Sequence, residues 1–305
     1  MRRVALAQPD LNAAILKAFQ ALRDSFTDAQ LARLIESGAV DRAVNAILSD
    51  EQIARATTAL QAEIQTTLQT NTLSAIRALP LPGAQVAVGF NVLSPNVLMA
   101  LRALNTKYLQ SMAADVRATF IEAIDQGLRD RKSISAIART LRSTLGLGPS
   151  QLQQVQNFRA ALEGESGRNP MTYALRPRNY DRIIQRGESL TPVQVDRATA
   201  MYLKRRIAQN AEILSRQAAI DSYKVANQLA WQAAADKGLV DLDALEGQWV
   251  GVMDDRERDW HVAMQGVKRK FTEPYIVPTQ GPENYPGEGE FGCRCVERIR
   301  VKATA

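Results

Sequence analysis

The sequence predicts a mainly α-helical protein with a small β-rich domain at its C-terminal end. Alanine, leucine, glutamine and arginine, which are strong helix formers, dominate most of the 305 residues. After Gly247 the composition changes, because the last 58 residues hold four of the twelve prolines, six of the seventeen glycines, both cysteines and the only histidine. We therefore expect two helical regions, residues 1–132 and 133–247, followed by a β-rich domain at 248–305.

The first region is expected to contain three or four helices between Pro9 and Leu79. Two capping-box patterns, Thr27–Gln30 and Ser49–Gln52, mark helix starts within it. The segment "LPLPGAQVAVGFN" then interrupts the helical pattern, and its residues 85–90 form a strand candidate. A helix over residues 95–128 should follow, with proline at its first position.

The second region should contain the longest helix of the chain. Two shorter helices are expected at 133–145 and 149–163, and the irregular stretch 165–190 has one helical turn at "YDRIIQR". The long helix opens at Thr191-Pro192 and meets no glycine or proline before Gly238, so we expect it over about 191–238. One apolar stripe follows it at helical spacing: Ile207, Ala211, Leu214, Ala218, Val225 and Leu229. Such a stripe predicts a packing surface rather than a cofactor site.

Short strands are expected in the C-terminal domain at "WVGVM", "KRKF", "PYIVP" and "CVERIRV". A tryptophan at the start of such a domain, here Trp249, is typical of a core anchor.

Charge and composition narrow the class of protein. The net charge is +6, which favours contact with polyanions or with an acidic partner surface, although no nucleic-acid fold signature accompanies it. No stretch approaches the roughly 18 apolar residues of a membrane span, and no signal peptide is expected. Two cysteines cannot form a disulfide-rich scaffold, which favours a reducing cytoplasm as the place of folding.

The histidine and the cysteines suggest a metal site. Zinc takes four ligands from cysteine, histidine and carboxylate, and the candidates are His261, Cys293, Cys295 and Asp254, with Asp255 as the alternative carboxylate. Residues two apart in an extended segment point to the same side, so both sulfurs can meet one ion. Two other readings stay open, since the usual zinc spacing is Cys-x2-4-Cys: a strained disulfide between the cysteines, or simple packing beside ion pairs of Asp254.

The same window resembles the C-terminal signature of the phage Mu F-like minor head proteins, also described as head morphogenesis proteins. The matching residues, in order, are Trp249, Asp254, Arg256, Arg258, His261, Gly266, Cys293, Arg294 and Cys295. The helical sequence before them is similar to the region that precedes the signature in this family, so the resemblance covers roughly residues 133–296. Two positions depart from it: "PGEGEFGCRC" lacks the family's histidine before Cys-Arg-Cys, and "QNAEI" retains only Glu212 of the family's Arg-Thr-Glu.

The resemblance implies a structural protein of a tailed-phage head, assembled in the host cytoplasm and placed in the virion at the portal, on the inner side of the capsid. Expected partners are the portal protein, the major capsid protein or scaffold, and packaged double-stranded DNA, with no membrane in the assembled head. No enzymatic activity is expected. The alternatives are a DNA-binding virion protein and a metal-dependent hydrolase or nuclease, for which Glu257 is the nearest additional carboxylate, although no His-Glu-x-x-His motif places it.

Overall fold

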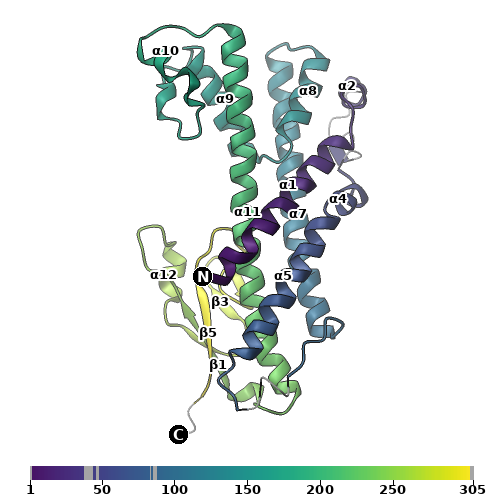
Figure 1. Ribbon diagram of the computed structural model, residues 1–305, viewed down its shortest axis with the longest axis vertical. Helices are drawn as coiled ribbons and strands as arrows, with labels where there is room; N and C mark the ends of the chain where they lie inside the picture. The colour runs from purple at the N-terminus through teal and green to yellow at the C-terminus, as the bar shows by residue number, and fades with distance from the viewer. Residues whose placement is uncertain (1, 38–43, 46–47, 83, 85–87, 303–305) are drawn as a thin grey trace. The chain divides into compact units, whose positions relative to one another are not determined.

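The computed structural model describes residues 2–37, 44–45, 48–82, 84 and 88–302, and it confirms a mainly helical chain with small antiparallel sheets near the C-terminus (Figure 1). No helix within these ranges is long and apolar enough to cross a membrane.

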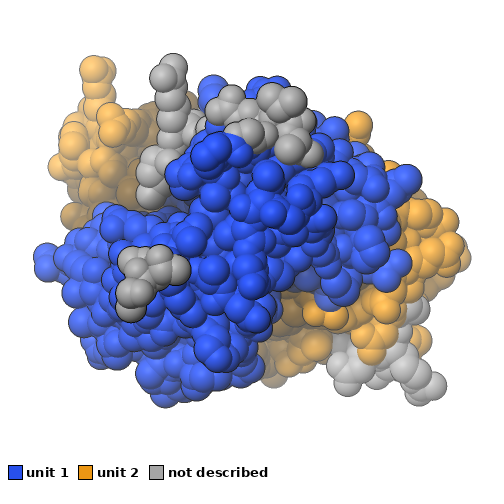
Figure 2. Space-filling view, turned by 90° about the horizontal axis from the view of Figure 1, so that it is seen from below, with its two compact units in different colours: residues 1–12, 60–107, 213–305 blue, residues 13–59, 108–212 orange. Residues whose placement is uncertain are grey.

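The chain divides into two compact units, each assembled from separate stretches of sequence (Figure 2). Unit 1 comprises residues 1–12, 60–107 and 213–305, and unit 2 comprises residues 13–59 and 108–212. The four helices that contain the unit boundaries are α1 (Arg2–Asp24), α5 (Thr58–Arg77), α7 (Pro95–Arg129) and α11 (Pro192–Asp236). The boundaries expected at residues 132 and 247 do not coincide with them, because a boundary inside a helix leaves no break in composition.

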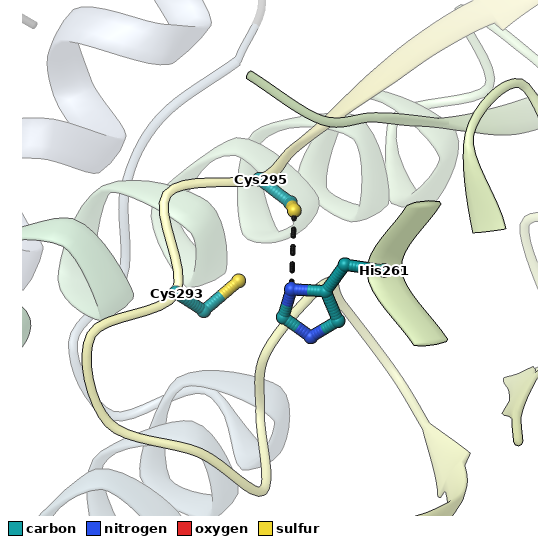
Figure 3. Close-up of side chains that lie close together, drawn as sticks. All are labelled: His261, Cys293 and Cys295. Carbon is teal, nitrogen blue, oxygen red and sulfur yellow. Dashed lines mark hydrogen bonds between the residues drawn. The ribbon is translucent and has the colours of Figure 1, made fainter. Parts of the chain in front are cut away.

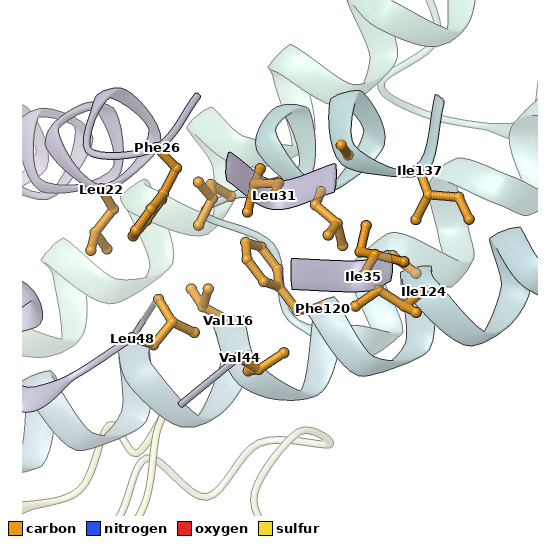
Figure 4. Close-up of a cluster of buried hydrophobic side chains, with 14 of the residues drawn as sticks. Leu22, Phe26, Leu31, Ile35, Val44, Leu48, Val116, Phe120, Ile124 and Ile137 are labelled. Carbon is orange, nitrogen blue, oxygen red and sulfur yellow. The ribbon is translucent and has the colours of Figure 1, made fainter. Parts of the chain in front are cut away.

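Unit 2 has a core built by short helices around the second half of α7. The helices are α2 (Asp28–Glu36), α4 (Asp50–Ala56), α8 (Ile134–Thr144) and α9 (Pro149–Leu162). Figure 4 shows Phe26, Phe120 and Ile137 among the side chains that meet in this core. The capping box expected at Thr27 is present, since its hydroxyl accepts from the backbone of Gln30 while the Gln30 side chain accepts from the backbone of Thr27.

A second apolar cluster of unit 2 joins α9 to the start of α11. Between these helices lie two 3-10 turns, η1 (Pro170–Thr172) and η2 (Arg178–Tyr180), and α10 (Asp181–Gln185), the single helical turn that the sequence predicts. The Phe158 ring stacks on Tyr202 with centroids 4.4 Å apart, and Tyr173 meets Phe158 at 5.2 Å. These rings hold the irregular segment against the two helices.

The longest helix matches its prediction closely, since α11 runs without interruption from Pro192 to Asp236. The stripe residues Ala211, Leu214, Ala218 and Val225 are buried, as expected for a packing surface.

Two other segments differ from the prediction. Helix α1 already begins at Arg2, so that Pro9 lies inside it. The strand expected at 85–90 lies partly outside the described residues, and residues 88–90 are not in a strand.

Two small antiparallel sheets form the C-terminal part of unit 1. The strands are β1 (Leu245–Val250), β2 (Lys268–Lys270), β3 (Tyr275–Val277), β4 (Gly281–Glu283) and β5 (Val296–Val301). Strand β1 is central, with β2 and β5 on either side of it, and β3 pairs with β4. The strand expected at "WVGVM" in fact begins earlier, at Leu245, and ends at Val250.

Candidate metal centre

Three side chains from two elements converge in the C-terminal part of unit 1. His261 lies on the short helix α12 (Asp259–Met264), and Cys293 and Cys295 lie on the loop that leads into β5 (Figure 3). One donor atom from each lies within 4.8 Å of the other two, and all three residues are at most 1% exposed. The structure therefore brings together three of the four predicted ligands.

The imidazole of His261 is oriented by acidic groups on both sides of the ring. Its Nδ1 lies 2.8 Å from Glu257 Oε1 and 3.5 Å from the sulfur of Cys295. Its Nε2 lies 3.2 Å from Glu290 Oε2. A ligating histidine usually presents its other ring nitrogen to a carboxylate, which fixes the tautomer and the ring orientation. Nδ1 therefore faces Cys295 and Glu257, and Nε2 lies near Glu290 without forming a hydrogen bond to it.

Glu257 lies beside this group and contacts two of its three members, His261 and Cys295. Its Oε1 is 3.5 Å from the sulfur of Cys295, and its side chain is only 4% exposed. Its second oxygen, Oε2, is buried and has no hydrogen-bond partner. The same is true of His261 Nε2 and Glu290 Oε2, so three buried polar atoms around the imidazole lack a hydrogen bond, which costs free energy.

The separation of His261 and Cys295 matches that of two ligands on one tetrahedral zinc ion, whereas the separation of His261 and Glu257 is shorter. Zinc bonds of about 2.3 Å to sulfur and about 2.0–2.1 Å to nitrogen or oxygen place a sulfur and a nitrogen ligand about 3.5 Å apart, and a nitrogen and an oxygen ligand about 3.4 Å apart. The Cys295–His261 separation of 3.5 Å agrees with this. The His261–Glu257 separation of 2.8 Å is a hydrogen bond, and it would open by about 0.6 Å when zinc replaces the proton between the two atoms.

Asp254, the carboxylate expected from the sequence, lies outside this cluster. Both of its oxygens are held by the guanidinium of Arg294, at 2.6 and 2.5 Å. This hydrogen-bonded pair lowers the pKa of Asp254 well below its usual range. The aspartate therefore fixes the arginine between the two cysteines, and Glu257 is the carboxylate that contacts the cluster.

A lysine places a positive charge beside the sulfurs. The Nζ of Lys224, a residue 4% exposed on α11, lies 3.8 Å from the sulfur of Cys293 and donates to the carbonyl of Pro286 at 2.7 Å. A hydrogen bond from Cys295, opposed by burial and aided by Lys224, lowers the pKa of Cys293 to about 6. The same hydrogen bond and burial raise the pKa of Cys295. In the absence of metal, one thiolate is therefore favoured over two.

The charges of this group balance when zinc is added. Two thiolates and the Glu257 carboxylate carry three negative charges, and zinc and Lys224 together carry three positive ones. A neutral sum removes the main cost of burying so many ionised groups, because buried charges are tolerated when they are paired or coordinate a metal.

Aromatic and glycine residues close the site from the sides. Trp249 is fully buried, and its ring meets His261 at 5.4 Å and Tyr275 edge-on at 5.3 Å, in line with its expected role as a core anchor. Gly287 has φ +74°, and a Cβ placed there would come within 2.4 Å of the Cys293 sulfur. A glycine is thus required where the loop crosses Cys293.

The sequence left two other interpretations of the cysteines open, a disulfide between them and simple packing. Both cysteines are free thiols, so the disulfide is not present in this structure. The cysteines do pack in the core, since Cys293 and Cys295 belong to a buried cluster with Trp249 and Met264. Packing and metal binding are compatible, because the same burial would keep water away from a bound ion.

Sequence reasoning missed Glu290 and Lys224 and gave Glu257 a different role. The only available signal for Glu257 was its spacing four residues before His261, which places the two side chains on neighbouring turns. Lys224 and Glu290 come from a distant helix and from a glycine-rich loop, and nothing local in the sequence links them to the cysteines.

No protein-family model matches the chain, and neither the curated proteins nor the solved structures contain a match to it.

Proposed function

We propose that the chain is a minor head protein of a tailed bacteriophage, and that its C-terminal part is stabilised by one zinc ion bound to His261, Cys293, Cys295 and Glu257. The role is structural rather than catalytic, and it would be exercised at the portal on the inner side of the capsid, beside the major capsid protein or scaffold. The proposal of a head protein starts from the signature residues, and the proposal of zinc starts from their geometry.

The observation that carries the proposal is that the signature residues form one connected group with a buried centre. Trp249, His261, Cys293 and Cys295 share one apolar cluster or its immediate contacts. Arg294 is bound to Asp254, and Arg258 bonds to Glu290 at 2.8 Å. In this arrangement the signature residues hold one another in place. Such mutual contacts are expected of residues whose role is to stabilise the fold.

Burial favours a structural ion over a catalytic one. Structural zinc sites are closed by four protein ligands, whereas catalytic sites keep one position open to water or substrate. Here the three residues of the cluster are at most 1% exposed, and in the proposed site the adjacent Glu257 carboxylate moves in to supply the fourth donor. A hydrolase or nuclease would need an open coordination position, so this alternative is disfavoured.

Co-expression with the portal protein encoded in the same genome tests the head role. We expect the full chain to elute with the portal oligomer in size-exclusion chromatography and to remain with it after affinity purification of the portal. A ring-shaped oligomer unrelated to portals serves as the control. Elution of the chain by itself, with the portal free, would overturn the proposed role.

A cleavage assay separates the structural from the enzymatic reading. Supercoiled plasmid incubated with the zinc-loaded protein should stay intact over hours. Zinc-dependent nicking that disappears in Cys295→Ser would replace the structural proposal with a nuclease.

A further inference from the structure

One part of unit 2 holds nearly all of the net positive charge of the chain. Residues 149–207, here named the arginine lobe, comprise α9, η1, η2, α10 and the first turns of α11, which lie together in Figure 1. Every residue of the lobe is described, and it has its own apolar core. Its ten cationic residues are Arg159, Arg168, Arg176, Arg178, Arg182, Arg186, Arg197, Lys204, Arg205 and Arg206, against five acidic ones, Glu163, Glu165, Asp181, Glu188 and Asp196. The lobe thus carries +5 of the total of +6.

Half of these cations are already engaged. Arg159 pairs with Glu163 and Asp196, and Arg176 and Arg186 pair with nearby carboxylates. Arg205 donates to the backbone carbonyls of Leu175 and Arg176, and Arg206 binds glutamine side chains. These contacts fix the irregular segment of the lobe against its helices. The other five cations have no such structural role.

The remaining five are exposed and form no ion pair or side-chain hydrogen bond in the structure: Arg168, Arg178, Arg182, Arg197 and Lys204. Two pairs of them repeat at helical spacing. Arg197 and Lys204 are seven residues apart on α11, which places them on one face of that helix, and Arg178 and Arg182 lie four residues apart in the adjoining η2 and α10. Like charges on one face repel each other, which is a cost unless an anion covers them.

The surroundings of these cations favour a phosphate backbone over an acidic protein. Protein interfaces have an apolar centre, but the apolar residues of this segment, among them Tyr180 and Ile184, pack on the core of the lobe. Val193 is the single large apolar side chain of the lobe that is exposed. Four of the five cations are arginines, whose planar guanidinium groups match phosphate oxygens in pairs.

We infer that the arginine lobe binds the backbone of double-stranded DNA without sequence preference, through Arg178, Arg182, Arg197 and their exposed cationic neighbours. Duplex DNA presents one phosphate charge per roughly 1.7 Å of its axis, so a surface of spaced cations needs no fixed register to bind it. This inference depends on neither the zinc ion nor the portal, and it can fail or hold independently of both.

The test is binding of the full-length chain to a fluorescent 30-base-pair duplex, followed by anisotropy over a range of salt concentrations. The triple variant R178Q/R182Q/R197Q should bind at least about tenfold more weakly at low salt. The slope of log affinity against log salt should become shallower by roughly 2–3, since each phosphate contact contributes about 0.9. The matched control is K17Q/R33Q/R102Q, which removes the same charge from exposed residues outside the lobe and without ion pairs in the structure. It should retain most of the affinity.

Two outcomes would overturn the inference. In the first, the control variant weakens binding as much as the lobe variant, which would mean that net charge alone attracts DNA. In the second, polyglutamate at equal charge displaces the duplex as well as unlabelled DNA does, which would indicate a surface for an acidic protein. Equal thermal unfolding midpoints of the three proteins exclude loss of folding as the cause.

Discussion

Nδ1 of His261 lies 3.5 Å from the sulfur of Cys295, although 34 residues separate the two in the chain. The contact joins a helix of six residues, which is too short to be stable by itself, to the loop before β5. A small unit with such short elements gains stability from a cross-link, and a metal ion is one form of cross-link.

Zinc content is the first prediction. The purified chain should contain about one zinc ion, and Cys293→Ser or Cys295→Ser should lose it, because each removes one of the proposed ligands. Since binding free energy becomes folding free energy, chelation should lower the thermal unfolding midpoint by several degrees or more. Elemental analysis and calorimetry measure both quantities.

Asp254→Ala is the control for this experiment. Its carboxylate is bound to Arg294 and lies outside the cluster, so the variant should keep its zinc. Zinc lost from Asp254→Ala but kept in Cys295→Ser would contradict the proposed ligand set.

The second prediction concerns the carboxylate behind the imidazole. Glu290 lies 3.2 Å from Nε2 of His261, accepts from Trp260 Nε1 at 2.7 Å and pairs with Arg258 at 2.8 Å. Glu290→Gln keeps the size of the side chain but removes its charge, so it should weaken zinc binding about 10–100-fold, as is usual for such supporting residues. Competition with a chromophoric chelator gives the affinity.

Glu273→Gln is the matched control, because Glu273 is an exposed glutamate of the same part of unit 1, paired with Lys270. Equal zinc affinities for the two variants would show that Glu290 does not orient the histidine.

The third prediction is a pH dependence of the metal-free protein. The pKa of Cys293 is lowered to about 6 in the folded state, against about 9 in the unfolded chain. A lowered pKa means that the unfolded state binds more protons, so the free energy of unfolding should rise from pH 6 to pH 9. Cys295, with a raised pKa, opposes this trend only as the pH approaches 9, because its thiol then begins to lose its proton in the unfolded chain but keeps it in the folded one.

Lys224→Met should reduce that slope, because it removes the positive charge 3.8 Å from the sulfur. Thiolate absorbance at about 240 nm, titrated in the presence of a chelator, should show a midpoint near pH 6 in the native protein and a higher one in the variant. The same midpoint in both would exclude Lys224 as a source of the shift.

Local sequence signals predicted the fold better than they predicted the site. The long helix at 191–238 and the capping box at Thr27 follow from spacing along the chain, and the structure has both. His261 and the two cysteines could be predicted as site residues because both residue types are rare in this chain and are common metal ligands. Asp254 was chosen for the same reason, but the choice between it and Glu257 depends on which carboxylate Arg294 holds. That contact spans 40 residues, and no local pattern encodes it.

The fourth prediction concerns a buried ion pair that supports the sheet next to the cluster. Arg269 on β2 and Glu297 on β5 meet at 2.8 Å, with side chains only 6% and 4% exposed. Glu297 also accepts from Tyr275 and Gln228, at 3.1 Å each. Burial raises the pKa of Glu297, and Arg269 opposes that rise. Arg269→Met should therefore lower the free energy of unfolding by about 3–5 kcal/mol, because it leaves a buried carboxylate without its counter-charge.

The pH at which this loss is measured distinguishes a charge effect from a packing effect. Without Arg269 the folded-state pKa of Glu297 lies further above its unfolded value, so the folded variant holds a proton that the unfolded chain releases as pH rises. The loss should then be smaller at pH 5 than at pH 8, and the double variant R269M/E297Q should recover part of it. Arg300→Met breaks an exposed pair with Glu246 and should cost less than about 1 kcal/mol. Urea unfolding at both pH values measures all of these, and an equal loss at pH 5 and pH 8 would show that Arg269 acts through packing alone.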